Sequence, residues 1–291
     1  MRLCFDATRF GSGLDGAIEI AAEKALTAVE FSFAPFTATG KTADLDEKER
    51  RHLLSVAELA KERGVAIASL NLDYCLDLEE KKSIKHFSQM VRKLSQVADA
   101  LDCARISFSL QAGCHDGWKQ TFEQLFRQLK PMLDEHRVSL LLRLSTPSQF
   151  RGVSLKKWRP MEPQDWRDLL SACNGELSLS FSPADCVWLG IDYLQILPGI
   201  ASAIDHIEAH DIEINRPMLT DSGMFGPLWW RYRLIGKGQV DWSQLIEALK
   251  LYDFQGTFSV HLDDEFVGEE SEELVNALDT SLKVVAGLVR D

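Results

Sequence analysis

The sequence predicts a single (β/α)8 barrel, the TIM-barrel fold, spanning residues 1–291 as one domain. Short apolar segments alternate with longer segments of helical period along the chain, which is typical of parallel sheets built from βα units. Eight segments of each kind can be counted, and the 291 residues are close to the roughly 250 that such barrels contain. No Pro/Gly/Ser-rich run or shift in composition marks a second domain.

The predicted strands are mostly apolar or alternate between apolar and polar residues, and each is followed by a segment whose length is normal for a crossover helix. The strands are predicted at residues 3–7, 28–32, 66–71, 104–109, 139–144, 177–181, 206–210 and 257–261. The helices are predicted at residues 16–26, 48–63, 78–100, 118–135, 163–172, 193–203, 242–251 and 271–289. This alternation predicts eight parallel strands.

An open doubly wound sheet is the alternative arrangement of the same elements. Such sheets usually carry a glycine-rich phosphate loop after the first strand. Here the first strand leads into Gly11-Ser12-Gly13, which is only part of that motif. A Gly-x-Gly by itself is typical of an ordinary turn, so the barrel remains the prediction.

Charge and apolar content limit the partners of the chain. The net charge is −12, from 32 basic and 44 acidic residues, and disfavours nucleic acid. The first residues lack the apolar core of a signal peptide, and no segment reaches the roughly 18 uninterrupted apolar residues of a membrane span. The six cysteines show no Cys-x-x-Cys spacing, which predicts neither a zinc knuckle nor a disulfide framework. We expect a cytoplasmic protein with no nucleic-acid or membrane partner.

Three segments at the carboxyl ends of the predicted strands are informative, because active sites of such barrels lie there. Residues 182–192 have the sequence SPADCVWLGID, residues 209–216 AHDIEINR, and residues 229–242 WWRYRLIGKGQVDW. They resemble, in that order, the segments Asp-Pro-x-His-x-x-x-x-Gly-x-Asp, His-Ala-Lys-Asp-Thr-Glu and Trp-Trp-Arg-Tyr-Arg...Gly-x-Gly-x-Val-Asp-Trp of xylose-isomerase-like sugar phosphate isomerases and epimerases. The third match is the longest, and the strand count extends the resemblance over the whole chain.

The resemblance implies a reaction as well as a fold. In that family a proton moves between neighbouring carbons of a sugar through an enediolate. A divalent metal holds the sugar oxygens, and its four ligands, Glu, Asp, His and Glu, stand at the ends of strands five to eight. The two glutamates also transfer the proton. Such oxygen and imidazole ligands suit Mn, Mg, Co or Zn.

This sequence departs from the family at all four ligand positions. They fall on Arg143, Ser182, Glu208 and His261, so the metal site is degenerate and no metal is predicted there. A further family histidine falls on Asp185. Arg143 is a permanent cation without an acceptor atom and cannot bind a metal.

Two interpretations of this departure are open. In the first, Arg143 replaces the charge of the metal, pairs with Glu208 or Asp185, and leaves the site free of metal. In the second, Asp185, Glu208 and His261 form a new three-ligand metal site, because all three remain residues of a ligand type.

Other candidate residues carry one functional and one structural interpretation each. Glu30 and Asn71 end strands two and three, where an inward polar side chain either bonds a sugar hydroxyl or caps the next loop. Arg231 and Arg233 either contact substrate oxygens, as the resemblance implies for this region, or form a salt-bridged loop. Trp230 either stacks on a sugar or packs within the loop or against another subunit.

Two histidines of the seventh strand need separate expectations. His206 lies two residues before Glu208 and so points to the same side of the strand, but deeper. We expect it to be a hydrogen-bonded core histidine. His210 matches the lysine of the family segment, and this change would replace a fixed positive charge by one that titrates near neutral pH.

Three hypotheses for function follow. The first is a divergent homologue that binds a small polar or sugar-like molecule without turning it over. The second is an active sugar isomerase or epimerase in which His261 is the base, Glu208 the acid or a ligand, and Arg143 the electrophile. The third is a scaffold that binds a protein partner through its Trp-rich loop, with self-association into a homo-oligomer also open.

Overall fold

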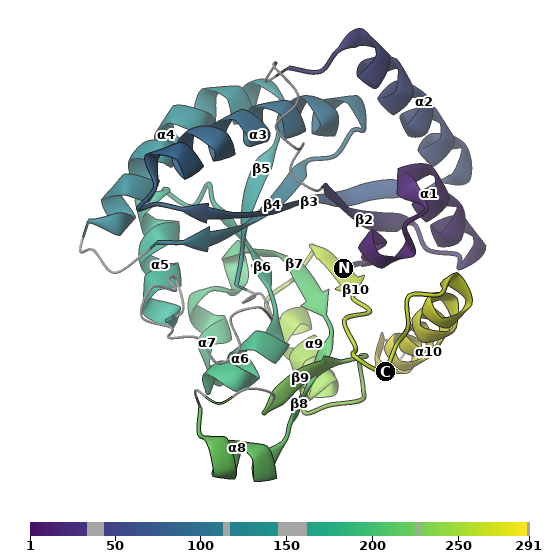
Figure 1. The fold of residues 1–291 in the computed structure, drawn as a ribbon, viewed down its shortest axis with the longest axis vertical. Helices are drawn as coiled ribbons and strands as arrows, with labels where there is room; N and C mark the ends of the chain where they lie inside the picture. Colours follow the sequence, from purple (N-terminus) through teal and green to yellow (C-terminus); the bar gives the residue numbers. More distant parts are fainter. Residues whose placement is uncertain (34–43, 113–116, 145–161, 225, 227–228, 290–291) are drawn as a thin grey trace.

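Eight parallel strands form the central sheet of the computed structural model, which describes residues 1–33, 44–112, 117–144, 162–224, 226 and 229–289 (Figure 1). They are β1 (Arg2–Phe5), β2 (Ala28–Phe33), β3 (Ala66–Asp77), β4 (Arg105–Gln111), β5 (Ser139–Arg143), β6 (Ser178–Phe181), β7 (Ile204–Ala209) and β10 (Thr257–Val260). Their spatial order is β1-β10-β7-β6-β5-β4-β3-β2, and a single parallel bridge between Asp6 and Glu30 joins the two outer strands. The predicted barrel is therefore confirmed.

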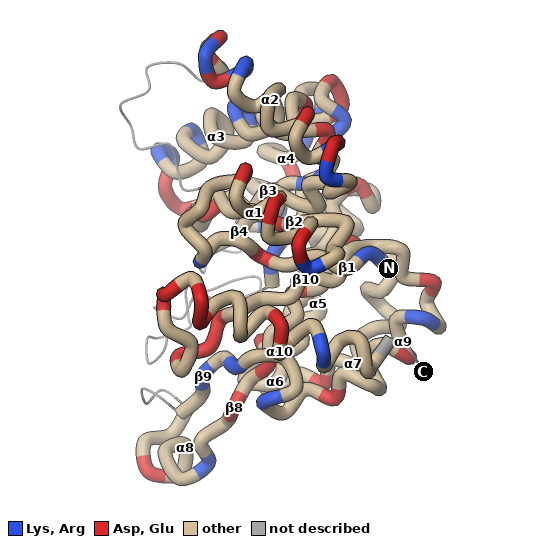
Figure 2. Tube along the Cα trace, turned by 90° about the vertical axis from the view of Figure 1, so that its right-hand side faces the viewer, with Lys and Arg blue, Asp and Glu red and all other residues tan. Residues whose placement is uncertain are grey.

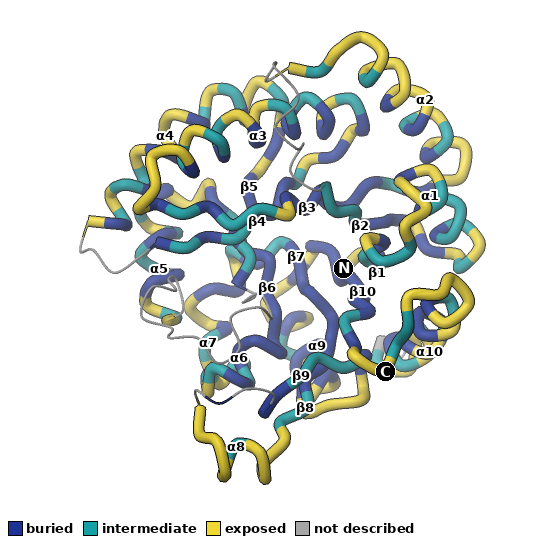
Figure 3. Tube along the Cα trace, in the orientation of Figure 1, coloured by how far each residue is buried: buried dark blue, intermediate teal, exposed yellow. Residues whose placement is uncertain are grey.

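Amphipathic helices cover the outside of the barrel (Figure 3). They are α1 (Gly13–Glu23), α2 (Glu47–Arg63), α3 (Lys81–Ala100), α4 (Trp118–Glu135), α5 (Pro163–Ala172), α9 (Trp242–Leu251) and α10 (Ser271–Val289). In α3 the buried residues Phe87, Met90, Val91 and Leu94 recur at helical spacing, as a helix with one buried face requires. Seven of the eight predicted helices are thus present in the part of the chain that the structure describes.

The predicted helix at residues 193–203 is wrong in its second half. Here α7 spans only Tyr193–Ile196, and single 3-10 turns follow at Leu197–Gly199 and Ala201–Ala203. Pro198 has no N–H to donate to the carbonyl of Leu194, so the helix cannot continue through it.

The sequence analysis missed four elements near the carboxyl ends of β6 and β7. They are α6 (Pro183–Leu189), α8 (Arg216–Ser222) and the antiparallel pair of β8 (Asp211–Ile214) and β9 (Trp230–Arg233). Figure 1 shows α8 as the element farthest from the barrel, with β8 and β9 between them. The hairpin brings the Trp-rich segment back to the barrel.

The interior of the barrel is unusually polar. The large apolar core lies between the sheet and the helices, whereas Cys4, Ala28 and Ala68 form only a small second cluster with Ala66. Barrels of this kind normally fill the interior with layers of bulky branched side chains. Here buried polar residues lie on six of the eight barrel strands or directly after them: Glu30, Ser69, Asn71, Ser107, Ser180, Ser182, His206, Glu208, His210, Thr257, Ser259 and His261. The less buried Asp6 and Arg143 lie on or directly after the other two strands, β1 and β5.

The outer surface carries charges of both signs. Figure 2 shows Asp and Glu interspersed with Lys and Arg over the helices. Among the described residues, none of the helices is both long enough and apolar enough to cross a bilayer.

Candidate functional site

A buried ion pair joins β5 to β7 at the carboxyl end of the barrel. The guanidinium of Arg143 donates to both carboxylate oxygens of Glu208, from Nε to Oε1 over 2.9 Å and from Nη2 to Oε2 over 2.8 Å. From β6, which lies between these strands, the Ser180 hydroxyl donates to the same Oε1 over 2.7 Å. The predicted pairing of Arg143 is confirmed, and its partner is Glu208.

The ion pair fixes the charge of Glu208. Burial alone would raise the pKa of this carboxyl, but the attraction and hydrogen bonds of Arg143 outweigh burial and lower the pKa to about 2. Conversely, although burial opposes the charge of Arg143, Glu208 raises the pKa of the guanidinium. Glu208 therefore has no proton to give near neutral pH, which argues against the acid role considered for it.

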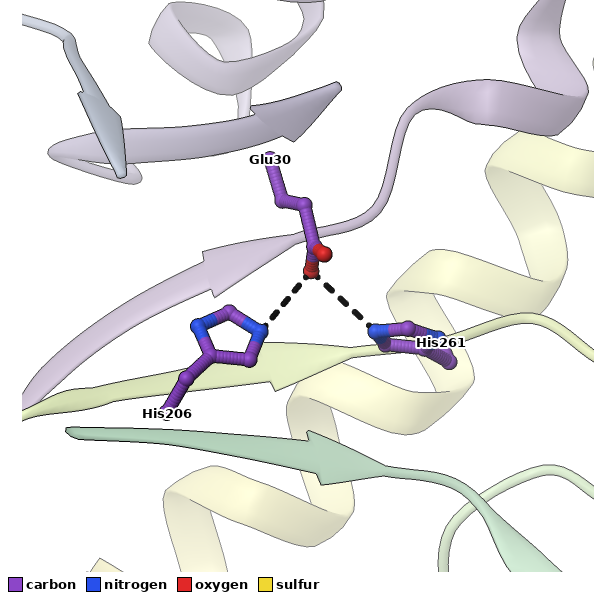
Figure 4. A group of neighbouring side chains, drawn as sticks. All are labelled: Glu30, His206 and His261. Atoms are coloured by element: carbon purple, nitrogen blue, oxygen red, sulfur yellow. Dashed lines mark hydrogen bonds and ion pairs between the residues drawn. The ribbon is translucent and has the colours of Figure 1, made fainter. Parts of the chain in front are cut away.

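A second buried cluster joins β2, β7 and the end of β10 (Figure 4). One oxygen of Glu30, Oε2, lies 3.0 Å from Nε2 of His206 and 3.1 Å from Nε2 of His261. The other ring nitrogen of His206 is hydrogen-bonded to the Thr257 hydroxyl. All three side chains are at most 1% exposed. The prediction of a hydrogen-bonded core histidine at His206 is confirmed, but its link to Glu30 was missed.

Charges within this cluster shift the pKa values of Glu30 and His261, and a catalytic role of His261 stays a prediction. Burial alone would raise the pKa of Glu30, yet His206 and His261 hold it well below its usual value. Burial alone would lower the pKa of His261, yet Glu30 and Asp263 raise it well above its usual value. A raised pKa favours the imidazolium form of His261, which suits an acid better than a base.

Asp6 is a titratable group beside this cluster. Its carboxyl lies 3.9 Å from Nδ1 of His261, and Asp263 lies 3.5 Å from the same nitrogen. Burial, partly offset by His261, raises the pKa of Asp6 to about 6. The sequence analysis did not single out Asp6, although its place near the carboxyl end of the predicted first strand could have indicated it.

The predicted metal ligands Asp185, Glu208 and His261 do not form one group in the structure. Oδ1 of Asp185 accepts hydrogen bonds from the Trp188 indole over 2.9 Å and the Tyr232 hydroxyl over 2.8 Å. The carboxyl of Asp185 thus serves to join α6 to β9, and burial raises its pKa. Among the described residues, the groups whose ligand atoms lie within 4.8 Å of one another are Glu30, His206 and His261, and Glu208, His210 and His261.

The remaining predicted site residues have structural partners. Asn71 is buried and accepts a hydrogen bond from the Ser107 hydroxyl. Arg231 forms an ion pair with Glu213, Arg233 one with Glu213 and one with Asp264, and both guanidinium groups lie over the ring of Phe266. These ion pairs favour the salt-bridged loop, and a ligand contact by Asn71, Arg231 or Arg233 stays a prediction.

Trp230 of β9 is buried against α6 rather than placed on an open surface. It is 3% exposed and stacks on Trp188 with ring centroids 5.0 Å apart. A protein-binding surface built on an exposed Trp230 is therefore disfavoured. Contact between Trp230 and a ligand stays a prediction.

Asp211, which lies in one of the segments that resemble the family, has a structural role. Oδ1 of Asp211 accepts the backbone N–H groups of Ile212 and Val240, and Oδ2 accepts the N–H of Gly236 and the indole of Trp242. A Cβ on Gly238 would lie 2.3 Å from Oδ1 of Asp211, so only glycine fits there. Asp211 therefore fixes the Gly-x-Gly-x-Val-Asp-Trp segment against the barrel.

The metal position of the resembling family does not fit a divalent ion in this chain. Both oxygens of Glu208 are occupied by Arg143, and the Ser182 hydroxyl is 3.2 Å from Nε2 of His210. A guanidinium has no lone pair to donate and would repel the ion. Arg143 and Glu208, which the resemblance aligns with two of the four family ligands, form an ion pair instead.

Comparisons with known proteins agree with the fold. The family model described as "Xylose isomerase-like TIM barrel" matches residues 18–281. An uncharacterised protein, YfiH of Bacillus subtilis (strain 168), is 23% identical over 119 residues, which span 38% of this chain and 38% of that protein.

Solved structures extend the similarity to nearly the whole chain. A xylose isomerase domain protein of Planctomyces limnophilus has a TM-score of 0.73 at 13% identity, covering 99% of this chain and 96% of that one. The IolI protein, solved with a bound zinc atom, has a TM-score of 0.72 at 15% identity, covering 99% and 98%. A D-psicose 3-epimerase, solved in the presence of D-fructose, has a TM-score of 0.70 at 11% identity, covering 97% and 98%.

Proposed function

The chain belongs to the xylose isomerase-like TIM barrel family, and we propose that it binds a small polar, sugar-like molecule at the carboxyl end of its barrel, with Arg143 in place of the family metal. The bidentate pair of Arg143 and Glu208 carries this proposal. In this proposal the guanidinium supplies a fixed positive charge where the resemblance implies a metal cation. Such a charge binds the oxygens of a ligand.

Arg143 has the donors that this role requires. Two of the five N–H groups of a guanidinium point to Glu208, and the other three have no further partner among the described residues. The side chain is 18% exposed, whereas Glu208 is fully buried. Glu208 thus holds the guanidinium in place, and the remaining donors serve a hydroxyl, carbonyl or carboxylate of the ligand.

Turnover of the ligand is the second candidate function. His261 as an imidazolium and Asp6, whose pKa is about 6, supply an acid and a titratable carboxyl beside the proposed ligand position. A bound ketose would then exchange a carbon-bound proton with solvent. Incubation with D-fructose in D2O, followed by NMR, separates turnover from binding alone, because only turnover puts deuterium on carbon.

Ligand binding is tested by calorimetric titration with D-fructose, D-tagatose and D-gluconate, on protein dialysed against a chelator. We expect at least one of them to bind the wild type without added metal. Arg143→Lys should weaken binding by about tenfold or more, because an ammonium cannot hold Glu208 through two parallel N–H groups and also present a planar set of donors.

The matched control is Arg105→Lys. Arg105 forms the same kind of bidentate pair, with Asp205 over 2.7 and 2.9 Å, but at the amino ends of β4 and β7. The Arg105→Lys variant should bind the ligand as tightly as the wild type does. The proposal is wrong if none of the three compounds binds the wild type, if binding needs added metal, or if the two lysine variants behave alike.

A further inference from the structure

We propose that Glu30, His206 and His261 bind one divalent transition-metal ion, with Zn2+ as the expected ion, at a position other than the one implied by the family. This position joins β2, β7 and the end of β10, whereas the family ligands stand at the ends of strands five to eight. The metal site would thus have moved within the barrel instead of having been lost.

The three ligand atoms already have a spacing suited to a metal. Both imidazoles turn the same nitrogen, Nε2, toward one oxygen of Glu30, over 3.0 and 3.1 Å (Figure 4). In a tetrahedral zinc site with bonds of about 2.0–2.1 Å, neighbouring ligand atoms lie roughly 3.3 Å apart. The two Nε2 atoms lie within 4.8 Å of each other, so an inward movement of the two rings brings all three ligand atoms around one ion.

Neighbouring groups hold the two rings in the required orientation. The Thr257 hydroxyl bonds Nδ1 of His206, which leaves Nε2 directed at Glu30. On the opposite side of His261, the carboxylate of Asp263 lies 3.5 Å from Nδ1. Histidine ligands of metals regularly bond a hydroxyl, carbonyl or carboxylate through their second nitrogen, as His206 does, and the Asp263 carboxylate lies at ion-pair distance from the second nitrogen of His261.

The donor set is one that zinc uses in catalytic sites. Two imidazoles and one carboxylate supply three protein ligands and leave a fourth position for water or a substrate oxygen. Metal binding releases the protons that now lie between Glu30 and the two Nε2 atoms. The positive charge of the ion then attracts the Glu30 carboxylate in place of these protons. All three ligands are at most 1% exposed, so bulk water competes little with them.

The other group of potential ligands is less suited to a metal. It shares His261 but adds Glu208 and His210. Arg143 and Ser180 hold the oxygens of Glu208, and Nε2 of His210 lies near Ser182. In contrast, the side-chain hydrogen bonds of Glu30 within the described residues go only to the two proposed histidine ligands. The inference does not depend on ligand binding by Arg143, which lies on β5.

The test measures zinc by plasma mass spectrometry on the full-length chain, loaded with Zn2+ and dialysed. We expect about one equivalent per chain in the wild type and a loss of about tenfold or more in Glu30→Gln and in His206→Gln. The matched control, His210→Gln, removes a buried histidine of the other group and should retain the metal. Circular dichroism shows which variants are folded, and only those are compared.

Loading with Co2+ gives a second measurement. Coordination by two imidazoles and a carboxylate produces visible absorption bands that an ion on the surface does not show. We expect these bands in the wild type and in His210→Gln. Absence of metal and bands in the wild type would mean that the cluster is only hydrogen-bonded, and loss in His210→Gln with retention in Glu30→Gln would assign the ion to the other group. Either result overturns the inference.

Discussion

Replacing Arg143 by methionine is expected to lower the free energy of unfolding by about 3–5 kcal/mol, because it leaves the buried carboxylate of Glu208 without its counter-charge. Glu208 is fully buried, so water cannot replace the guanidinium. Urea denaturation at pH 7 measures the loss. The control Arg105→Met should lose less, because Arg105 and Asp205 are 24% and 31% exposed and water compensates part of that ion pair.

A double-mutant cycle separates the ion pair from general packing. Glu208→Gln alone leaves a buried cation, whereas Arg143→Met with Glu208→Gln leaves no buried charge. The double variant should therefore lose about 2 kcal/mol less than the sum of the two single variants. Additive losses would show that Arg143 and Glu208 do not interact.

The same ion pair predicts how the effect depends on pH. The pKa of Glu208 is about 2 in the folded protein, below its ordinary value of 4.5. A lowered carboxyl pKa stabilises the folded state above the ordinary value and ceases to do so as pH falls toward the folded value. Without Arg143, burial leaves the pKa of Glu208 above 4.5 in the folded variant, so the stability difference between wild type and Arg143→Met should already shrink as pH falls toward 4.5 and continue to shrink down to about pH 2.

Asp211→Asn is expected to destabilise the protein by at least about 3 kcal/mol, although it changes only one atom of the side chain. The carboxylate accepts four N–H donors, two on each oxygen. An asparagine amide presents its own N–H groups to two of them, so two buried donors lose their acceptor and are repelled. Urea denaturation measures the loss.

Asp241→Asn is the matched control for this variant. Asp241 begins α9, where its carboxylate accepts the N–H of Gln244. Asparagine caps helices about as well as aspartate, so the stability of this variant should stay close to that of the wild type. Equal losses in the two variants would contradict the special role assigned to Asp211.

The barrel could be predicted from the sequence because its elements are set by local patterns. The period of apolar residues located seven of the eight helices, as in α3, where Phe87, Met90 and Leu94 recur at helical spacing. The pair of β8 and β9 could not be found in this way. The end of β8 at Ile214 and the start of β9 at Trp230 are sixteen positions apart in the sequence. No short turn therefore lies between the two strands to indicate a hairpin.

The site was predictable only in part, for a geometric reason. Arg143 ends β5 and Glu208 lies next to the end of β7, with only β6 between these strands, so their pairing follows from charge and from the order of the strands. The contact of Glu30 with His206 joins residues 176 positions apart across the interior of the barrel. Strand order does not tell which inward side chains meet across that interior, because tilt and register decide it.

The central claim, that Arg143 and Glu208 fill the family's metal position, is tested most directly by anomalous diffraction from crystals of the full chain soaked with Zn2+ or Mn2+. The account predicts no anomalous density among Arg143, Ser182 and Glu208, with Arg143 still bonded to both oxygens of Glu208. Density at coordination distance from Glu208, with the guanidinium turned away, would contradict it. Density at Glu30 would concern only the separate metal site proposed above.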